Sequence, residues 1–277
     1  MFRSRVTLTN ARQAIILMTD TNGAPPRLGD LDLEAHLRDP ARKQQFVTPM
    51  FDIIAPRYDA FTRLFSFGMD RVWKQRAIDL AVRRAPRATM LLDLASGTGD
   101  VAVMLARALP DSRVAAVDAS PRMIEIARER LQRADRDVSD RVHTDVGDML
   151  GLTQETASMD LVTASYGVRN VPDSRQAIRE MARVLKPGGL LVTLDFYRPS
   201  FAPWRALFLW YLSIAGNVVG WWWHRDPVVY GYIARSIAHF MSANEFHALL
   251  ESEGLRVRET KRYLGGGVAT HVAERVQ

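Results

Sequence analysis

The sequence predicts an α/β fold whose core is a mostly parallel sheet of seven strands. Five short apolar segments, typical of strands in a parallel sheet, alternate with segments of helical periodicity between residues 90 and 196. These strands are expected at Met90–Leu94, Arg113–Val117, Arg141–Val146, Met159–Ala164 and Gly189–Phe196. Two alternating segments, Leu255–Tyr263 and Val268–Val276, are joined through glycines and predict an antiparallel C-terminal hairpin that completes the sheet.

A glycine-rich turn follows the first strand. Residues 92–100 read LDLASGTGD, which places Gly97 and Gly99 where a buried strand gives way to a helix at Val101–Leu109. Glycine at such a crossover lets the backbone approach a ligand closely. The run from Gly97 to Ala102 also fits the dinucleotide fingerprint, so the glycines alone leave two cofactors open.

Carboxylates near this turn favour S-adenosylmethionine over a dinucleotide. Asp93 and Asp100 flank the glycines. Carboxylates in these positions would repel a pyrophosphate bound at the N-terminus of the helix. The ammonium and sulfonium groups of S-adenosylmethionine are cations that carboxylates attract. Asp118 ends the second strand and is expected to bind the two ribose hydroxyls. The alternative role for Asp100 is structural: its negative charge would only stabilise the positive end of the helix dipole.

The ends of the third and fourth strands complete the predicted cofactor site. Asp148 is expected to accept a hydrogen bond from the adenine amino group, and Met149 to lie against the ring. The alternative for Asp148 is an ordinary surface turn. The full predicted set of cofactor-binding residues is Asp93, Ala95, Gly97, Thr98, Gly99, Asp118, Ala119, Asp148, Met149 and Ser165.

Composition excludes several other classes of site. The 37 basic and 31 acidic residues give a net charge of +6, but the arginines are scattered through predicted helices, so nucleic acid is not an expected partner. The chain has no cysteine and therefore no disulfide, thiolate nucleophile or thiolate metal site. Its six histidines show no close metal-ligand spacing, and no metal is expected.

The domain organisation is expected to be a flexible leader at 1–40 followed by one domain at 41–277, whose residues 41–85 form a helical cap. Glycine and proline are frequent in residues 19–40. The opening residues weakly resemble a transit peptide, and translation from Met18 would leave 1–17 outside the native protein. No secretory signal is evident, so a cytoplasmic protein is expected.

An uncharged aromatic segment, Ala206–Trp223, follows the fifth strand. It is expected to form part of a helical insert at 198–241 that covers an apolar substrate or lies at a membrane surface. Trp221–Trp223 beside His224 and Arg225 match the aromatic and basic composition of a headgroup interface. The alternatives are a membrane span, a buried core helix and a contact between two copies of the chain.

From about Lys43 to the C-terminus the chain resembles the C-methyltransferases of ubiquinone and menaquinone biosynthesis. The turn Gly167–Val171 resembles the active-site turn of the family. The other motifs that carry the resemblance are Phe51-Asp52 to Tyr58-Asp59, Leu64–Gly68 followed by Arg71 and Trp73-Lys74, and Arg183–Gly189. The resemblance implies a Rossmann-like methyltransferase sheet. The chain departs from the family pattern in three places: Thr62 stands where the family has Asn, Asp70 where it has His, and Asp195-Phe196-Tyr197 where it has Glu-x-Ser.

The resemblance implies that a ring carbon of an apolar polyprenyl quinol attacks the methyl group of S-adenosylmethionine, which leaves S-adenosylhomocysteine. Arg169 is then expected to stabilise the phenolate oxygen, and Asn170 to position that oxygen or a water. Water, Asp59 or Asp70 takes the proton, and Tyr58 closes the pocket. A structural ion pair is the alternative for Arg169. An enzyme of this kind is expected to bind peripherally to the inner face of the membrane.

Three other functions stay open at this point. The first is a methyltransferase that acts on another apolar phenol, a sterol or a secondary metabolite, which the three departures from the family pattern suggest. The second is a catalytically silent cofactor-binding subunit. The third is a nicotinamide-dependent oxidoreductase, since the glycine turn alone is compatible with it.

Overall fold

The computed structural model describes residues 40–223 and 228–276, and side chains are described outside 40–42, 44–46 and 216–231. The expected leader therefore lies almost wholly outside the described residues, as do 1–17. The side chains of Trp221–Trp223 and the two residues after them also lie outside this range.

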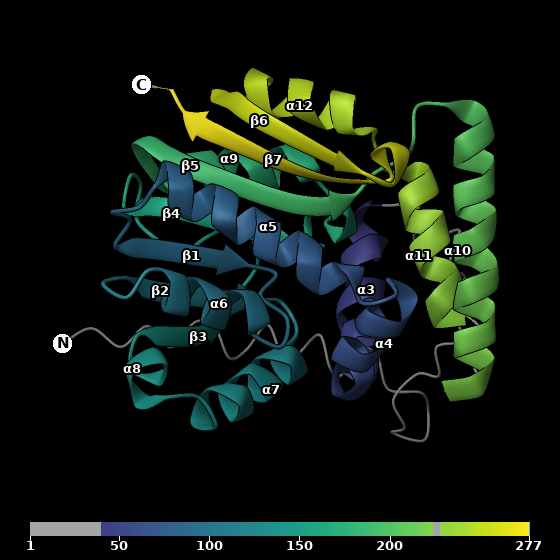
Figure 1. Cartoon of the computed structure of the whole chain (residues 1–277), viewed down its shortest axis with the longest axis horizontal. Coiled ribbons are helices and arrows are strands. Elements are labelled where there is room, and N and C mark those ends of the chain that lie inside the picture. Colours follow the sequence, from purple (N-terminus) through teal and green to yellow (C-terminus); the bar gives the residue numbers. More distant parts are fainter. Residues whose placement is uncertain (1–39, 224–227, 277) are drawn as a thin grey trace.

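The sheet has seven strands in the order β3-β2-β1-β4-β5-β7-β6 (Figure 1). The first five pair in parallel, and β7 pairs antiparallel with both β5 and β6. The strands are β1 (Met90–Leu94), β2 (Arg113–Asp118), β3 (Val142–Val146), β4 (Met159–Ser165), β5 (Leu185–Phe196), β6 (Leu255–Tyr263) and β7 (Val268–Arg275). This confirms the predicted fold class, including the C-terminal hairpin.

Strand β5 begins at Leu185, four residues before the expected start at Gly189. Leu185 pairs with Met159, and the next pair joins Leu190 to Leu161. The register therefore shifts at Lys186–Gly189, where Gly188 has a φ of 78°. A Pro-Gly-Gly sequence is typical of a turn, and here it lies within a strand that continues on both sides of the irregularity.

Helices cover both faces of the sheet and bury alternate strand residues. Leu91 of β1 faces a core shared with α5 (Met69–Arg84) and α6 (Asp100–Ala108). Leu92 and Leu94 face the opposite core, shared with α9 (Ser174–Val184) and α12 (Ala243–Ser252). This period-two alternation is what a strand that is buried on both faces requires. The remaining sheet-associated helices are α7 (Pro121–Gln132) and α8 (Arg136–Ser139).

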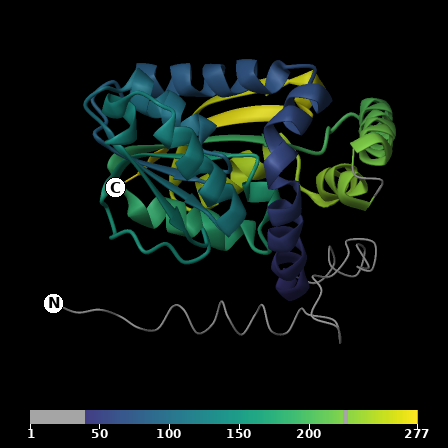
Figure 2. The same cartoon turned by 90° about the horizontal axis from the view of Figure 1, so that it is seen from below.

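A separate helical layer lies beyond the carboxyl ends of the parallel strands (Figures 1 and 2). It consists of α3 (Pro40–Ile54), the short turn η2 (Ala55–Arg57), α4 (Tyr58–Phe65), α10 (Ala202–Trp223) and α11 (Val228–His239). These helices share a third core, in which Met50, Phe61 and Phe65 are buried with Phe208 and Leu212. We call this part of the protein the helical layer.

Helix α10 contains the whole uncharged aromatic segment. Among the residues that the structure describes, no helix is both long enough and apolar enough to cross a membrane.

Candidate active site

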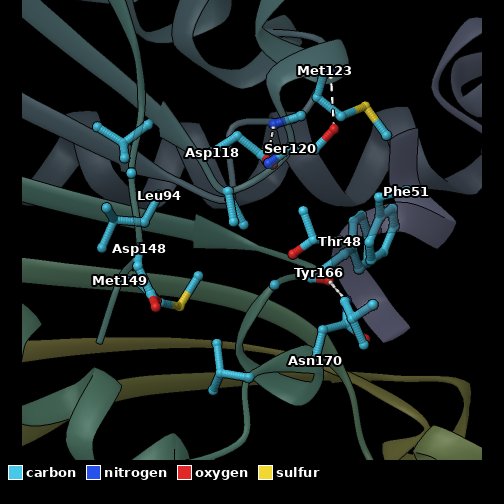
Figure 3. A pocket seen from close by; sticks show the side chains of 18 of the residues that line it. Thr48, Phe51, Leu94, Asp118, Ser120, Met123, Asp148, Met149, Tyr166 and Asn170 are labelled. Atoms are coloured by element: carbon cyan, nitrogen blue, oxygen red, sulfur yellow. Dashed lines mark hydrogen bonds between the residues drawn. The ribbon is translucent and has the colours of Figure 1, made fainter. Parts of the chain in front are cut away.

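Three adjoining cavities lie where the helical layer meets the carboxyl ends of the strands. The first, which we call the cofactor cavity, is bounded by the ends of β1, β2 and β4 (Figure 3). Seven of the ten predicted cofactor-binding residues line it: Ala95, Gly97, Asp118, Ala119, Asp148, Met149 and Ser165. Asp93 and Thr98 line a smaller cavity beside it, which we call the acidic cavity. Gly99 lines neither.

The two glycines of the turn have different roles. Both have left-handed backbones, with φ of 54° at Gly97 and 79° at Gly99. A Cβ on Gly97 would meet nothing within 4 Å, so the turn presents open space to a ligand. A Cβ on Gly99 would lie 3.0 Å from the Cβ of Ala127, so that glycine permits close packing against α7.

Asp118 supports the turn as well as facing the cofactor cavity. Its two carboxylate oxygens accept hydrogen bonds from the backbone N–H groups of Gly97 and Ser120, both at 2.8 Å. Burial raises the pKa of this carboxyl group, against the lowering effect of those hydrogen bonds. Each carboxylate oxygen can accept more than one hydrogen bond, so this arrangement is compatible with a ribose ligand.

The acidic cavity contains two carboxylates in different electrostatic states. Asp100 lies 2.7 Å from the ammonium group of Lys74, a pair that holds the pKa of Asp100 below its usual value even though burial opposes this. Asp93 accepts a hydrogen bond from the Thr163 hydroxyl at 2.6 Å through Oδ1. Its buried Oδ2 has no hydrogen-bond partner among the described residues, and burial raises its pKa to about 7. Asp93 is therefore partly protonated near neutral pH, and a ligand cation beside it would favour the ionised form.

The third cavity, which we call the aromatic cavity, lies between the sheet and the helical layer. Its wall includes Phe51, Tyr58, Phe61, Phe65, Tyr166, Phe196 and Tyr232, and its polar groups come from Arg57, Thr62, Ser66, Asp70 and Arg169. Tyr58 and Tyr166 also line the cofactor and acidic cavities. The aromatic and cofactor cavities are therefore neighbours that share walls, which is what a transfer between two bound molecules requires.

Arg169 and Asn170 lie on the short turn η3 (Val168–Asn170) that follows β4. The Arg169 Nη1 donates to Asn170 Oδ1 at 2.7 Å, and Nε lies 3.4 Å from an oxygen of buried Asp195. Asn170 donates to the carbonyl oxygen of Tyr166 at 3.0 Å and accepts from the Tyr232 hydroxyl at 3.1 Å. Arg169 therefore forms the ion pair that was considered as its alternative role. The same side chain also lines the aromatic cavity.

The two carboxylates considered as proton acceptors lie in different places. Asp59 accepts from the Thr98 hydroxyl at 2.7 Å and forms an ion pair with Arg130, and it lines none of the three cavities. Asp70 lines the aromatic cavity, where it accepts from the Ser66 hydroxyl at 3.0 Å. Tyr58 faces all three cavities, and burial raises its pKa to about 12, so it stays protonated.

The departures from the family pattern also differ in location. Thr62 and Asp70 line the aromatic cavity. Tyr197 is fully buried on the other side of the sheet, with its hydroxyl 3.4 Å from Nδ1 of His271. Only the first two can contact a molecule in the aromatic cavity.

Polar side chains of the helical layer attach it to the cofactor loops. Lys43 of α3 donates to the carbonyl oxygens of Arg169 at 2.9 Å and Val171 at 2.8 Å. Burial, together with the charge of Arg169, lowers the pKa of Lys43 to about 8. Asp52 accepts from the hydroxyl of Ser120 at 2.5 Å. Sequence reasoning missed all of these contacts and the Lys74 pair, although Lys74 was part of a motif that carried the family resemblance.

Within the described residues, no group of three or more His, Asp or Glu side chains could hold a metal ion.

Comparison with known proteins identifies the family. Residues 40–275 match the model of the ubiE/COQ5 methyltransferase family. The chain is 35% identical to the demethylmenaquinone methyltransferase of Thermus thermophilus over 226 residues, which covers 82% of this chain and all of that protein. It is 37% identical to the ubiquinone/menaquinone biosynthesis C-methyltransferase UbiE of Syntrophotalea carbinolica, covering 83% of this chain and 93% of its relative.

Solved structures share the fold at low sequence identity. The cyclase SpnF superposes with a TM-score of 0.60 at 17% identity, covering 84% of this chain and 96% of SpnF. The geranyl diphosphate C-methyltransferase of Streptomyces coelicolor was solved with S-adenosylhomocysteine. It superposes with a TM-score of 0.54 at 16% identity, covering 73% of this chain and 77% of that chain. Because one of these is a cyclase, the fold alone does not fix the reaction. The family match does fix the enzyme class: the chain belongs to the ubiE/COQ5 methyltransferase family and is an S-adenosylmethionine-dependent methyltransferase.

Proposed function

We propose that this enzyme transfers a methyl group from S-adenosylmethionine to a ring carbon of a polyprenyl quinol in quinone biosynthesis. The observation that carries the proposal is the aromatic cavity, which contains Arg169 and Asp70 and shares Tyr58 and Tyr166 with the cofactor cavity. Its aromatic walls suit a flat apolar ring. The names of the relatives, demethylmenaquinone methyltransferase and UbiE, support a quinol as the substrate.

The residues of the cofactor and acidic cavities fit S-adenosylmethionine, which supplies an electrophilic methyl group when bound. Asp93 would face its ammonium group, because one carboxylate oxygen is buried without a partner. Asp118 would hold the ribose hydroxyls. Asp148 and Met149 would contact the adenine from the end of β3.

Residues of the aromatic cavity would prepare the ring for attack. Asp70 would accept the proton of a ring hydroxyl, and the guanidinium of Arg169 would stabilise the phenolate oxygen. A ring carbon then forms a bond to the methyl carbon while the carbon–sulfur bond breaks, and its electron pair stays on sulfur. The attacked ring carbon then loses its own proton, which restores an aromatic phenolate, and the phenolate oxygen regains the proton held by Asp70. The net reaction releases one proton for each methyl group transferred.

The exposed face of α10 supports peripheral membrane binding. Leu207, Trp210 and Ile214 follow helical spacing on one face of α10, and 52%, 62% and 44% of their surfaces are exposed. Phe67, which is 79% exposed, stacks on Tyr211 of the same helix at 6.2 Å. A substrate with a long apolar tail resides in the bilayer, so an enzyme that acts on it gains from an apolar surface on the helical layer, other helices of which line the aromatic cavity.

A second candidate is a methyltransferase for another apolar phenol. It is favoured by Thr62 and Asp70, the two departures from the family pattern that line the aromatic cavity. A single assay separates the candidates. The enzyme is incubated with labelled S-adenosylmethionine and either purified demethylmenaquinol or a total membrane lipid extract, and products are identified by mass spectrometry. Methylated quinone supports the proposal, and label confined to another phenol overturns it.

Membrane binding is tested by flotation with liposomes that contain anionic lipid. The variant Leu207→Ser/Trp210→Ser should float less than the wild type. Val276→Ser, which alters an exposed apolar side chain 44% accessible at the end of the chain, should float normally. A wild-type protein that stays at the bottom of the gradient and sediments as a dimer would assign this face of α10 to a contact between two copies.

A further inference from the structure

The hydroxyl group of Tyr166 is an unused polar group at the centre of the site. Tyr166 is 6% exposed, and its hydroxyl oxygen is buried with no hydrogen-bond partner among the residues that the structure describes. Leaving a buried donor unpaired lowers stability, which is why such groups usually have partners. At this position the side chain lines all three cavities. A ligand bound between the cavities is therefore the natural source of the missing partner.

Tyr166 has an unfavourable backbone conformation, which the surrounding structure must maintain. Its φ is 59°, in the left-handed region that residues with a side chain rarely adopt. Its N–H donates to the carbonyl oxygen of Leu194 at 2.7 Å. The next residue, Gly167, packs so tightly that a Cβ there would lie 2.3 Å from the Cβ of Ala95. Strained residues of this kind concentrate at functional sites.

The surroundings keep the Tyr166 hydroxyl protonated. Burial raises its pKa well above the usual value, and the negative charges of Asp70, Asp195 and Asp100 act in the same direction. The neighbouring Tyr58 is itself protonated, and the Lys74 ammonium lies 5.6 Å from the centre of the Tyr166 ring. The ring rests on Phe196 at 5.4 Å. The side chain is thus a fixed, neutral hydrogen-bond donor.

Arg169 is not the whole source of hydrogen bonds to a substrate oxygen. Its Nη1 donates to Asn170, whereas its Nε lies 3.4 Å from an oxygen of Asp195 in the ion pair and makes no hydrogen bond among the described residues. Part of its hydrogen-bonding capacity is therefore committed within the protein. A developing oxygen anion is best stabilised by more than one donor that is oriented before the reaction begins.

We infer that Tyr166 is a further catalytic residue, which donates a hydrogen bond to the ring oxygen of the phenolic substrate while negative charge builds on that oxygen. The inference rests on the proposed function for the identity of the ring. Tyr166 keeps its proton throughout, so it stabilises the phenolate and does not act as the base. An anionic oxygen strengthens this hydrogen bond relative to a neutral hydroxyl, which is the property that accelerates the reaction.

The test uses p-nitrophenol, whose ionised form absorbs visible light, bound to the full-length enzyme with S-adenosylhomocysteine. The variant Tyr166→Phe removes only the hydroxyl group. The pKa of the bound phenol should rise by about one unit in this variant, as expected for the loss of one hydrogen bond to an anion. Tyr197→Phe removes another buried tyrosine hydroxyl, away from the three cavities, and should leave that pKa unchanged.

Turnover provides the second measurement. With a quinol that the wild type methylates, Tyr166→Phe should lower kcat by about 10–100-fold and leave S-adenosylhomocysteine affinity within about twofold. Its melting temperature should not fall, because the lost hydroxyl has no partner in the protein. An unchanged pKa of bound p-nitrophenol, or failure of the phenol to bind, overturns the inference. Absence of quinol turnover by the wild type overturns the proposed function instead, and the phenol titration still decides on Tyr166.

Discussion

The guanidinium of Arg169 and the carboxylate of Asp195 form a buried pair, with Nε 3.4 Å from Oδ1. Asp195 is fully buried in β5 and also accepts from the backbone N–H of Arg169 at 3.2 Å. Burial raises the pKa of Asp195, and the charge of Arg169 opposes that rise. The pair fixes the guanidinium at the wall of the aromatic cavity before any substrate binds.

The first prediction concerns the planar shape of that guanidinium. Arg169→Lys keeps a positive charge opposite Asp195 but cannot reproduce the geometry of the bond to Asn170, so kcat should fall by about 100-fold. S-adenosylhomocysteine affinity, measured by calorimetry, should stay within about twofold. Arg128→Lys, on the exposed side of α7, is the control and should retain activity. A defect limited to cofactor affinity would contradict the role of Arg169 at the substrate ring.

The second prediction concerns the pH dependence of cofactor binding. Burial places the pKa of Asp93 at about 7 in the ligand-free protein. A ligand ammonium favours the ionised carboxylate, so binding lowers this pKa and releases a proton. Affinity for S-adenosylhomocysteine should therefore rise as the pH increases from 5 to 7 and then level off.

Calorimetric titration at pH 6 in two buffers of different ionisation enthalpy measures that proton directly. Between about half a proton and one proton should be released per ligand bound. Asp93→Asn should abolish the release and flatten the pH profile. Proton uptake by the wild type would show that the cation does not face Asp93.

The third prediction separates the two roles of Asp118. Asp118→Ala removes the proposed ribose contacts, each worth about 1.5–3 kcal/mol for a charged acceptor, so S-adenosylhomocysteine affinity should fall at least about tenfold. The melting temperature should also fall modestly, because Gly97 and Ser120 lose their shared acceptor. Asp145→Ala, an exposed aspartate of β3, is the matched control for both measurements. Unchanged affinity would reject Asp118 as the ribose ligand.

The fourth prediction concerns the ion pair between Lys74 and Asp100. Lys74→Met leaves Asp100, whose side chain is 28% exposed, without its buried cation, so the free energy of unfolding should decrease by about 1–3 kcal/mol in urea titrations. The double variant Lys74→Met/Asp100→Asn should recover more than half of that loss, because the uncompensated charge is gone. Equal instability of the single and double variants would mean that packing of the lysine chain, not its charge, is the main contribution.

The sequence predicted the sheet and the cofactor turn because both depend on local patterns. The apolar strands and the glycines at 97 and 99 can each be recognised from a few consecutive residues, and the structure confirms their arrangement. The start of β5 was not readable, since a Pro-Gly-Gly sequence usually marks a turn. In this chain, pairing with β4 carries the strand across it.

Contacts between distant segments were beyond sequence reasoning. Lys43 binds the carbonyl oxygen of Arg169 across 126 positions of the chain, and no periodic pattern indicates that contact. Asp59 was expected as one of three proton acceptors, whereas the packing of α4 directs it to Thr98 and Arg130. The unpaired hydroxyl of Tyr166 depends on how three separate segments pack around it, which no local sequence pattern indicates.

The separate core of the helical layer has a consequence for how the enzyme can change over time. Residues of α3 and α4 are buried against α10 and α11, while the strands whose ends line the cofactor cavity are buried mainly against other helices. The described residues of α10 line none of the three cavities, so substitutions in that helix act mainly on the third core. The sequence of that helix can therefore vary with little effect on the residues that line the cofactor cavity.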